Sequence, residues 1–462
     1  MTTIIKAGGS SVATPERLVG GYLGGKPIPG IYPQLHGMDD RIIFITSAQG
    51  KTTDAIKKFI RDANDPKTVC PLPEPEDLFA YSTRFGITYS PTSSARRYSV
   101  FREIEKIGTD PDTRRQLDDN SYVAMLHLMG ERIAAIDAYE LALQSGWDCA
   151  LIDIIDERFP LSVTGDYMNA GIDFADTANR ARKMLDGTKA HMLIFPGYGG
   201  MNRSTRKGGI LARGGSDRSA IALQYATRAR SLGILTDVDG IKAANVDGAK
   251  TVPILGLRDA KAAATFGAKL PGSNSLEGLK MRHDEGEEPE VYIAHAQRIH
   301  GDRTEIVKDA KNSGSVILVA GRPVDVYTFE GNISGIEDTL RGRNVEFTMI
   351  TGNADSLSIA VPNENRDHTN LVIEEYMQHR RRKTNGVRVE YEQGKGHIGV
   401  VGGVRNTTGI LETCAGLLAR EGINIEDAAD PSRNSSGFIV NESDIKPGIE
   451  TLYRRLILER AS

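Results

Sequence analysis

Two glycine-rich segments of this 462-residue chain carry residues whose types and spacing suit the binding of anions. In the first, "KAGGSS", Lys6 is followed by Gly8, Gly9 and Ser10, so an ammonium group stands next to consecutive backbone N–H groups. Such a lysine binds phosphate oxygens as a point charge, while the amides act as directional donors. The segment therefore indicates either a phosphate site or a simple turn between a strand and a helix.

The second segment, "ARGGSD", sets Arg213 and Asp217 on either side of two glycines, directly before an apolar pattern with a helical period. A helix that begins here presents free N–H groups, which attract an anion. A glycine turn capped by Ser216 or Asp217 explains the bare pattern equally well. The remainder of the chain has to decide between the two.

Other candidate residues follow apolar runs elsewhere in the chain. They are Ser47 and Thr53 in "TSAQGKTTDAI", Glu131 in "GER", Thr236, Asp237 and Asp239 in "TDVDG", and Lys269 in "FGAK". Each has a plain alternative, such as a surface carboxylate for Glu131 within its helical pattern. Together, the glycines, hydroxyls and lysines at successive strand ends favour a phosphoryl-transfer site, in which cations and amides surround the transferring phosphate.

The elements that must position these residues alternate between strands and helices. Strands are predicted over 2–8, 41–48, 149–156, 190–200 and 231–240. Helical patterns cover 121–146 and 173–185, whereas 20–30 is too rich in glycine and proline for a regular helix, and 64–76 is predicted to be a surface loop. This alternation predicts an α/β sandwich with a largely parallel sheet, whose ligands lie beyond the carboxyl ends of the strands.

The last 150 residues contain an internal repeat. At an offset of 80 residues, "NVE" (344–346) aligns with "NIE" (424–426), and Ser356 aligns with Ser436. Each copy has the order strand, helix, strand, strand, with a shorter helix in the first copy, as expected of a small duplicated α+β module. A duplicated module that follows an α/β domain in the sequence suggests that the α/β domain is catalytic and that the duplicated module senses a ligand.

Composition excludes several classes of protein. Lysine and arginine number 57 against 61 aspartates and glutamates, and the net charge of −4 gives no overall basic field to recruit nucleic acid. Cys70, Cys149 and Cys414 form no zinc-ligand spacing and no evident disulfide framework. No run approaches the ~18 apolar residues of a membrane span, and the first residues lack the apolar run of a signal peptide. The sequence therefore predicts a cytoplasmic protein.

Taken in order, the motifs resemble those of the aspartate kinases in the amino-acid kinase family. The family's "KFGGTS" is similar to "KAGGSS" here, its "SAMGxTTDxL" to "SAQGKTTDAI", its "GERLS" to "GERIA", and its "GRGGSD" to "ARGGSD". Its "TDVDGVYTADP" and "FGAKVLHP" are similar to "TDVDGIKAANV" and "FGAKLPGS". The C-terminal repeat resembles tandem ACT regulatory domains, most clearly in its second copy. The resemblance covers essentially the whole chain.

The resemblance implies a three-layer αβα amino-acid kinase domain over 1–305, followed by two ferredoxin-like α+β ACT domains, a shortened one over 314–390 and another over 391–462. It implies transfer of the ATP γ-phosphate, with Mg²⁺, to the side-chain carboxylate of L-aspartate, giving 4-phospho-L-aspartate, the first step toward lysine, threonine and methionine. It also implies lysine or threonine as a possible effector at the ACT domains, and a homodimer or higher homo-oligomer.

The resemblance assigns a role to each candidate residue. Lys6, Gly9 and Asp217 are the catalytic group; Ser47, Thr53, Glu131 and Arg213 bind substrate, with Arg213 on the α-carboxylate and Glu131 on the ammonium; and Lys6, Gly8, Gly9, Ser10, Thr236, Asp237, Asp239 and Lys269 bind the nucleotide. No metal ligand is assigned to the protein itself. Two alternatives remain open because the residues after "TDVDG" and "GAK" depart from the family: a kinase for another small amino acid, and a non-catalytic ACT-containing sensor.

Overall fold

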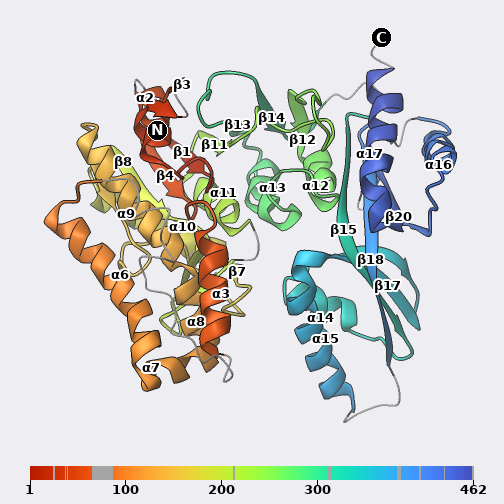
Figure 1. The fold of residues 1–462 in the computed structure, drawn as a ribbon, viewed down its shortest axis with the longest axis horizontal. Coiled ribbons are helices and arrows are strands. Elements are labelled where there is room, and N and C mark those ends of the chain that lie inside the picture. The colour runs from red at the N-terminus through yellow and green to blue at the C-terminus, as the bar shows by residue number, and fades with distance from the viewer. Residues whose placement is uncertain are drawn as a thin grey trace. The chain divides into compact units, whose positions relative to one another are not determined.

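A computed structural model describes the chain except residues 24–25, 37, 39, 65–86, 212–213, 311–314, 382–386, 405–406, 431 and 460–462. The predicted loop over 64–76 and Cys70 thus lie mostly outside the described residues. The chain divides into two compact units, Met1–Gly240 with Ser275–Glu305, and Ile241–Asn274 with Ile306–Ser462 (Figure 1). Among the described residues, no helix is long and apolar enough to cross a membrane.

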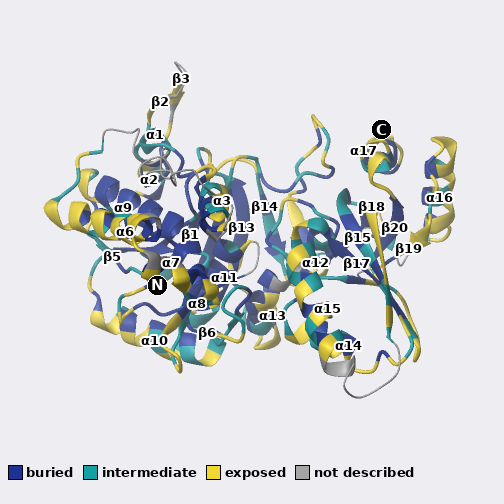
Figure 2. Cartoon of the chain, turned by 60° about the horizontal axis from the view of Figure 1, so that its bottom comes forward, coloured by how far each residue is buried: buried dark blue, intermediate teal, exposed yellow. Residues whose placement is uncertain are grey.

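The first unit is built on a mostly parallel sheet. Its strands run in the order β14-β13-β11-β1-β4-β8-β5. Their bounds are β1 Thr2–Ala7, β4 Arg41–Thr46, β5 Cys149–Leu151, β8 Met192–Pro196, β11 Ser231–Thr236, β13 Glu290–His295 and β14 Arg303–Val307. All neighbouring pairs are parallel except β13 with β14. The strands are almost fully buried, as continuous apolar runs in a parallel sheet require (Figure 2).

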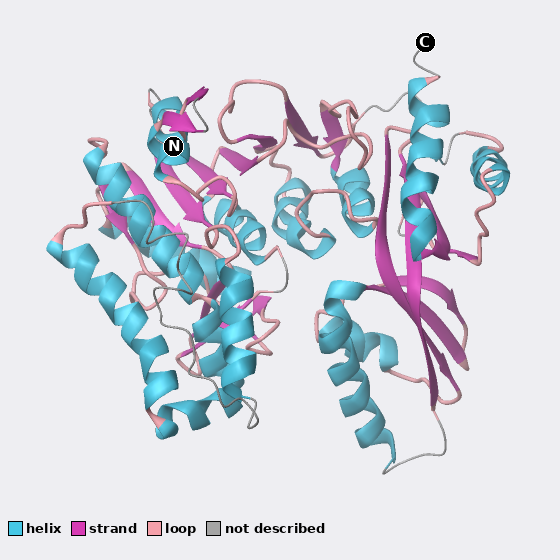
Figure 3. Cartoon of the chain, in the orientation of Figure 1, coloured by secondary structure: helices cyan, strands magenta, loops and turns pink. Residues whose placement is uncertain are grey.

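Helices cover both faces of this sheet (Figure 3). The longer ones are α3 Thr52–Asn64, α6 Pro91–Thr109, α8 Asn120–His127, α9 Met129–Gln144, α10 Phe174–Gly187, α11 Gly215–Thr227 and α13 Glu277–Asp284. Because side chains alternate along a strand, Ile5 and Ala7 face the core that contains α9, while Lys6 faces α11. The helical pattern over 121–146 forms two helices, which meet at Leu128.

The core on the α9 face contains an aromatic group around the single tryptophan. The Trp147 ring stacks on His36 at 4.5 Å between centroids and on His191 at 5.9 Å. Tyr32 meets Trp147 edge-on at 6.5 Å and donates a hydrogen bond to the carbonyl of Ala138 on α9. These contacts fix α2 (Ile31–Leu35) against the sheet and α9.

The second unit is built on an antiparallel sheet shared by the two repeat copies. Its strand order is β16-β17-β15-β18-β20-β19. The first copy comprises β15 Leu318–Glu330, α14 Ile336–Gly342, β16 Thr348–Gly352, β17 Ser356–Pro362 and α15 Arg366–Arg381; the second comprises β18 Arg388–Val401, α16 Ile410–Arg420, β19 Asp427–Ala428, β20 Ser435–Asn441 and α17 Ile445–Tyr453. Each copy ends in a helix that the repeat pattern did not predict, and α14 is shorter than α16, as the sequence predicted.

The segment Ile241–Asn274 also belongs to the second unit. It contains β12 Ile254–Gly256 and α12 Leu257–Thr265. The backbone N–H of Lys250 donates to the hydroxyl of Tyr453 at 3.1 Å, and the amide of Asn434 donates to Asp259 on α12 at 2.6 Å. The residues that follow β11 are therefore tied to the C-terminal sheet.

Candidate active site

The two glycine-rich segments meet at the carboxyl end of β1. Lys6 lies one residue before the end of the strand, and Asp217 lies in the first turn of α11. The Lys6 Nζ atom is 2.7 Å from Asp217 Oδ1, and the two side chains are only 11% and 16% exposed. A pair this close and this poorly hydrated fixes the direction of the ammonium group, so Asp217 orients Lys6.

The loop after Lys6 lies directly against the loop after β4. A side-chain carbon on Gly9 would lie 2.4 Å from the carbonyl oxygen of Ala48, so only glycine fits at this position. The backbone N–H of Gly50 points to the carbonyl of Gly9 at 3.4 Å, and that of Ser47 donates to Ala7 at 3.2 Å. Gly8 donates to the carbonyl of Leu235 on β11 at 3.1 Å. The two loops are thereby held at one edge of the sheet.

Glu131 lies under these loops at the start of α9. It is 4% exposed, and its Oε2 atom has no hydrogen-bond partner among the described residues. Burial raises the pKa of the Glu131 carboxyl to about 8, while backbone amides and the charges of Lys57 and Lys6 oppose that rise. A buried carboxylate with an open oxygen is costly unless a cation reaches it, so the site is suited to receive a positively charged group.

The hydroxyl residues predicted for substrate lie beside these groups. Ser47 follows β4, and Thr53 lies in the first turn of α3; both are half-buried. Gly130, next to Glu131, would place a side-chain carbon 3.3 Å from Thr52, which shows how closely α9 and α3 approach. Ser10 is exposed at the end of its loop.

The predicted nucleotide residues are only partly brought together. Thr236 ends β11, next to β1, and its hydroxyl lies 3.2 Å from Asp237. Asp239 accepts two hydrogen bonds from Arg298, at 2.9 and 2.8 Å. Lys269 is exposed and belongs to the second unit. Arg213 lies outside the described residues.

Comparison with known proteins identifies the family of this chain. The model of the amino acid kinase family matches residues 1–272. The chain belongs to the amino acid kinase family.

Relatives and solved structures extend the likeness to the C-terminal sheet. Aspartokinase 2, chloroplastic, of Arabidopsis thaliana is 21% identical over 498 residues, which cover 98% of this chain and 84% of the relative. The structure of E. coli aspartokinase III in complex with aspartate and ADP matches with a TM-score of 0.77 at 18% identity, covering 99% of this chain and all of that one. Its complex with lysine and aspartate matches with a TM-score of 0.62 at 18% identity and 99% coverage of both chains. The predicted fold, an αβα kinase domain followed by α+β modules, is confirmed.

This amino acid kinase has site residues that the sequence did not single out. Tyr198, in "FPGYGG", has a left-handed φ of 73°, and its ring would lie 2.6 Å from a side-chain carbon on Gly215 at the start of α11. Burial and the nearby charge of Glu131 raise the pKa of the Tyr198 hydroxyl. The glycine turn was visible in sequence, but the backbone strain that aims the tyrosine was not.

A buried polar network also supports the loop after β4. Asp137 on α9 is fully buried and accepts hydrogen bonds from Tyr89 at 2.9 Å, from Gln49 at 3.3 Å, and from Arg97 on α6. Burial raises the pKa of Asp137, and Arg97 opposes that rise. The network fixes the loop that carries Ser47 to the helix that carries Glu131. Its members come from three distant segments, so no sequence pattern announced it.

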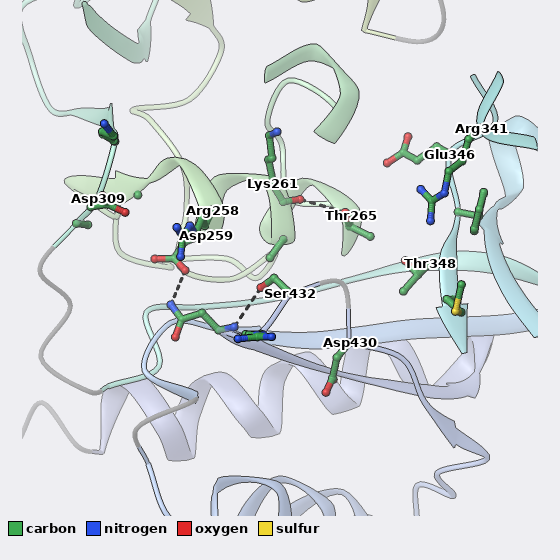
Figure 4. A pocket seen from close by; sticks show the side chains of 18 of the residues that line it. Arg258, Asp259, Lys261, Thr265, Asp309, Arg341, Glu346, Thr348, Asp430 and Ser432 are labelled. Atoms are coloured by element: carbon green, nitrogen blue, oxygen red, sulfur yellow. Dashed lines mark hydrogen bonds between the residues drawn. The ribbon is translucent and has the colours of Figure 1, made fainter. Parts of the chain in front are cut away.

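A cavity of about 900 Å³ lies in the second unit, and none of the predicted site residues that the structure describes lines it (Figure 4). Its walls carry both signs of charge. The basic residues are Arg258, Lys261, Lys308, Arg341 and Arg433, and the acidic residues are Asp259, Asp309, Glu346 and Asp430. Arg258 and Lys261 come from α12, while Arg341 and Glu346 come from the first repeat copy. The cavity therefore suits a small charged molecule.

Proposed function

We propose that this protein is an aspartate kinase, which transfers the γ-phosphate of ATP to the side-chain carboxylate of L-aspartate and yields 4-phospho-L-aspartate. The observation that carries the proposal is that one site contains both a buried carboxyl group and an oriented ammonium group. Glu131 offers a buried carboxyl whose ionised form a bound cation would stabilise, and Lys6, which Asp217 orients, offers an ammonium group that can also donate to phosphate oxygens. An amino acid with a second carboxylate, bound beside a phosphate, places its ammonium group at Glu131 and the phosphate at Lys6.

The chemistry needs little help from an acid or a base. The acceptor carboxylate, with an ordinary pKa of about 3.9, is already ionised at neutral pH and is itself the nucleophile. The barrier lies in bringing one anion to another, and positioned cations and amides lower it. Lys6 neutralises charge on the transferring phosphoryl group, Gly8 and Gly9 bring the backbone close to its oxygens, and Asp217 orients Lys6.

The other assignments follow the resemblance to the family. Glu131 receives the α-ammonium of aspartate, Arg213 forms a bidentate pair with its α-carboxylate, and Ser47 and Thr53 hold the substrate. Thr236, Asp237, Asp239 and Lys269 contact the nucleotide, together with Ser10. We further propose that the kinase domain covers 1–305 and that the ACT domains cover 314–390 and 391–462. In the pathway, the product leads to lysine, threonine and methionine.

The residues present fit ATP accompanied by Mg²⁺. A side-chain carbon on Gly9 would meet the carbonyl oxygen of Ala48, so glycine at this position lets the loop after Lys6 keep its backbone beside the ammonium group, as a phosphate site requires. An ion that accompanies ATP is commonly held chiefly by nucleotide phosphates and water. When bound, Mg²⁺ neutralises the ATP phosphates.

The charged cavity of the second unit is our candidate for an amino-acid effector such as lysine or threonine. An α-amino acid requires cations for its carboxylate, which Arg258 and Lys261 offer, and an anion for its ammonium group, which Glu346 offers. Lysine or threonine should lower the rate of the wild-type enzyme and lose that effect in Glu346→Gln. Equal inhibition of both proteins would exclude Glu346 from the effector site.

The deciding experiment for the proposed function measures ATP turnover by the purified protein with Mg²⁺ and L-aspartate, trapping the acyl phosphate with hydroxylamine. We expect hydroxamate with aspartate and far less with glutamate, whose longer side chain misplaces the nucleophile. Hydroxamate with a different small amino acid would support the paralogue alternative. No hydroxamate with any acid, despite ATP binding, would leave the sensor alternative.

We also propose that the protein is at least a dimer, because ACT modules commonly pair their sheets across subunits. Sedimentation at micromolar concentration should give a mass of at least twice the 50.2 kDa of one chain. A single species at the mass of one chain would contradict this proposal.

A further inference from the structure

The motif that carries Lys269 is anchored to the C-terminal sheet by its first residue, Phe266. The Phe266 ring is fully buried against two glycines, Gly399 on β18 and Gly437 on β20, which are direct partners in the sheet. A side-chain carbon on Gly399 would lie 2.2 Å from ring atoms of Phe266, and one on Gly437 would lie 2.6 Å away. The notch for the ring therefore exists only because both facing strand positions lack a side chain.

A histidine closes the notch from within the sheet. The ring of His397 on β18 meets the Phe266 ring edge-on at 4.6 Å between centroids. Its Nε2 atom lies 2.9 Å from the carbonyl oxygen of Ala429, which fixes the orientation of the imidazole. Burial lowers the pKa of His397 to about 4, so the ring is neutral and packs as an aromatic partner at neutral pH.

Arg322 on β15 also contacts the backbone next to Phe266. Its guanidinium group donates to the carbonyls of Ala264 and Thr265, the last residues of α12, at 3.4 Å each. Gly267, with a φ of +87°, would place a side-chain carbon 2.7 Å from Arg322 Cβ, so the backbone passes directly over the arginine. Arg322 also pairs with Glu364, and lies 3.6 Å from Glu346, a residue of the charged cavity.

The connection from this anchor to Lys269 is short and hydrogen-bonded. The N–H of Gly267 donates to Ala264, that of Ala268 donates to Ala263 at 2.9 Å, and that of Leu270 donates to Ala268 at 2.7 Å. A displacement of Phe266 must therefore move the backbone that carries Lys269, because only two residues separate them. The cavity, with α12 as one wall, lies on the same segment (Figure 4).

We propose that Phe266 is a positioning residue for Lys269, and that its seat between Gly399 and Gly437 lets the C-terminal sheet set the affinity of the enzyme for nucleotide. The proposal rests on the nucleotide role given to Lys269 in the proposed function. It identifies the contact through which a change in the second unit alters the binding of ATP rather than that of aspartate.

The test compares Gly399→Ala with the wild-type chain by calorimetric titration with ADP, which requires no turnover. The added methyl group meets the Phe266 ring and displaces it, so we expect ADP affinity to fall about tenfold, as when a ligand loses one hydrogen bond to a charged group. Lys269→Ala should weaken ADP binding by a similar factor. Gly416→Ala, the same change at a helix position with nothing within 4 Å, is the matched control and should bind ADP as the wild type does.

A compensating variant guards against simple loss of folding. Adding Phe266→Leu to Gly399→Ala removes the bulk that the methyl group meets, and should restore most of the ADP affinity. Where the aspartate reaction is measurable, Gly399→Ala should raise the KM for ATP and leave the KM for aspartate unchanged.

Two results would overturn the proposal: Gly399→Ala lowers the melting temperature but leaves ADP affinity unaltered, or Lys269→Ala binds ADP as tightly as the wild type. A protein that forms no hydroxamate but loses ADP affinity in Gly399→Ala would refute the proposed function and support this inference.

Discussion

Replacing Glu131 by glutamine should change how stability depends on pH. The protein raises the pKa of this carboxyl from its ordinary 4.5 to about 8 by burying it. The unfolded chain releases the proton near pH 4.5, whereas the folded chain keeps it until pH 8, so folding becomes less favourable as pH rises between these values. At about 1.4 kcal/mol per pH unit, the whole interval corresponds to about 5 kcal/mol of lost stability.

Glutamine has nearly the same shape as glutamate but no proton to release, so the stability of the variant does not fall in this way as pH rises. We expect wild type and Glu131→Gln to have similar free energies of unfolding near pH 5. From pH 5 to pH 8 the variant should gain about 3–4 kcal/mol relative to the wild type. The assay is urea denaturation of both proteins, without ligands, at half-unit steps of pH across this range.

A matched control on the same helix separates the effect from a general response of α9. Glu140 is equally buried, but its carboxylate accepts a hydrogen bond from Ser90, so a change of the same size in Glu140→Gln would assign the effect to α9 as a whole and not to the open oxygen of Glu131. A difference in unfolding free energy between wild type and Glu131→Gln that stays constant within about 1 kcal/mol from pH 5 to pH 8 would refute the raised pKa of Glu131. That result would mean that Glu131 is ionised in the folded protein, with its charge compensated.

Three further predictions concern the reaction. Arg213→Ala should raise the KM for aspartate about 100-fold and the KM for ATP far less. An unchanged aspartate KM in the hydroxamate assay would mean that Arg213 does not bind the α-carboxylate. Lys6→Met should lower kcat by a factor of about 10² to 10³, since it removes the cation that faces the transferring phosphate; a kcat within threefold of wild type at saturating substrates would exclude that role. Gly9→Ala would place a methyl carbon 2.4 Å from the Ala48 carbonyl oxygen, so it should reduce kcat sharply. Gly187→Ala, where nothing lies within 4 Å of the added carbon, is the control and should have the wild-type rate. Equal rates for the two variants would show that the loop tolerates the added methyl group.

The kinase sheet could be predicted well from sequence because its strands are buried on both faces. The apolar runs at 2–8, 41–48 and 231–240 became β1, β4 and β11, which are neighbours in the sheet. The resemblance to the family placed Lys6 and Asp217 in one catalytic group, and in the structure their side chains are 2.7 Å apart. The run at 149–156 formed only the short β5, because the pattern cannot tell where a partner strand ends.

The remaining features depend on contacts between distant segments, which no local pattern records. The raised pKa of Glu131 follows from its burial by other segments of the chain, and the helical pattern around Glu131 does not reveal that burial. The charged cavity takes its lining from four separate parts of the chain. The anchoring of α12 and Phe266 to the C-terminal sheet could not be predicted either, because the notch depends on two glycines more than 130 residues further along the chain.

The position of the single tryptophan gives the molecule a built-in optical reporter. Trp147 is the only tryptophan in the sequence, and its ring stacks on His36 and on His191 in the first unit. Emission excited selectively from indole therefore comes from the first unit alone, while the second unit contributes only to far-ultraviolet circular dichroism and tyrosine signals. Melting curves recorded by both methods on one sample would superimpose if the two units unfold together, and would separate if the C-terminal sheet loosens before the kinase core.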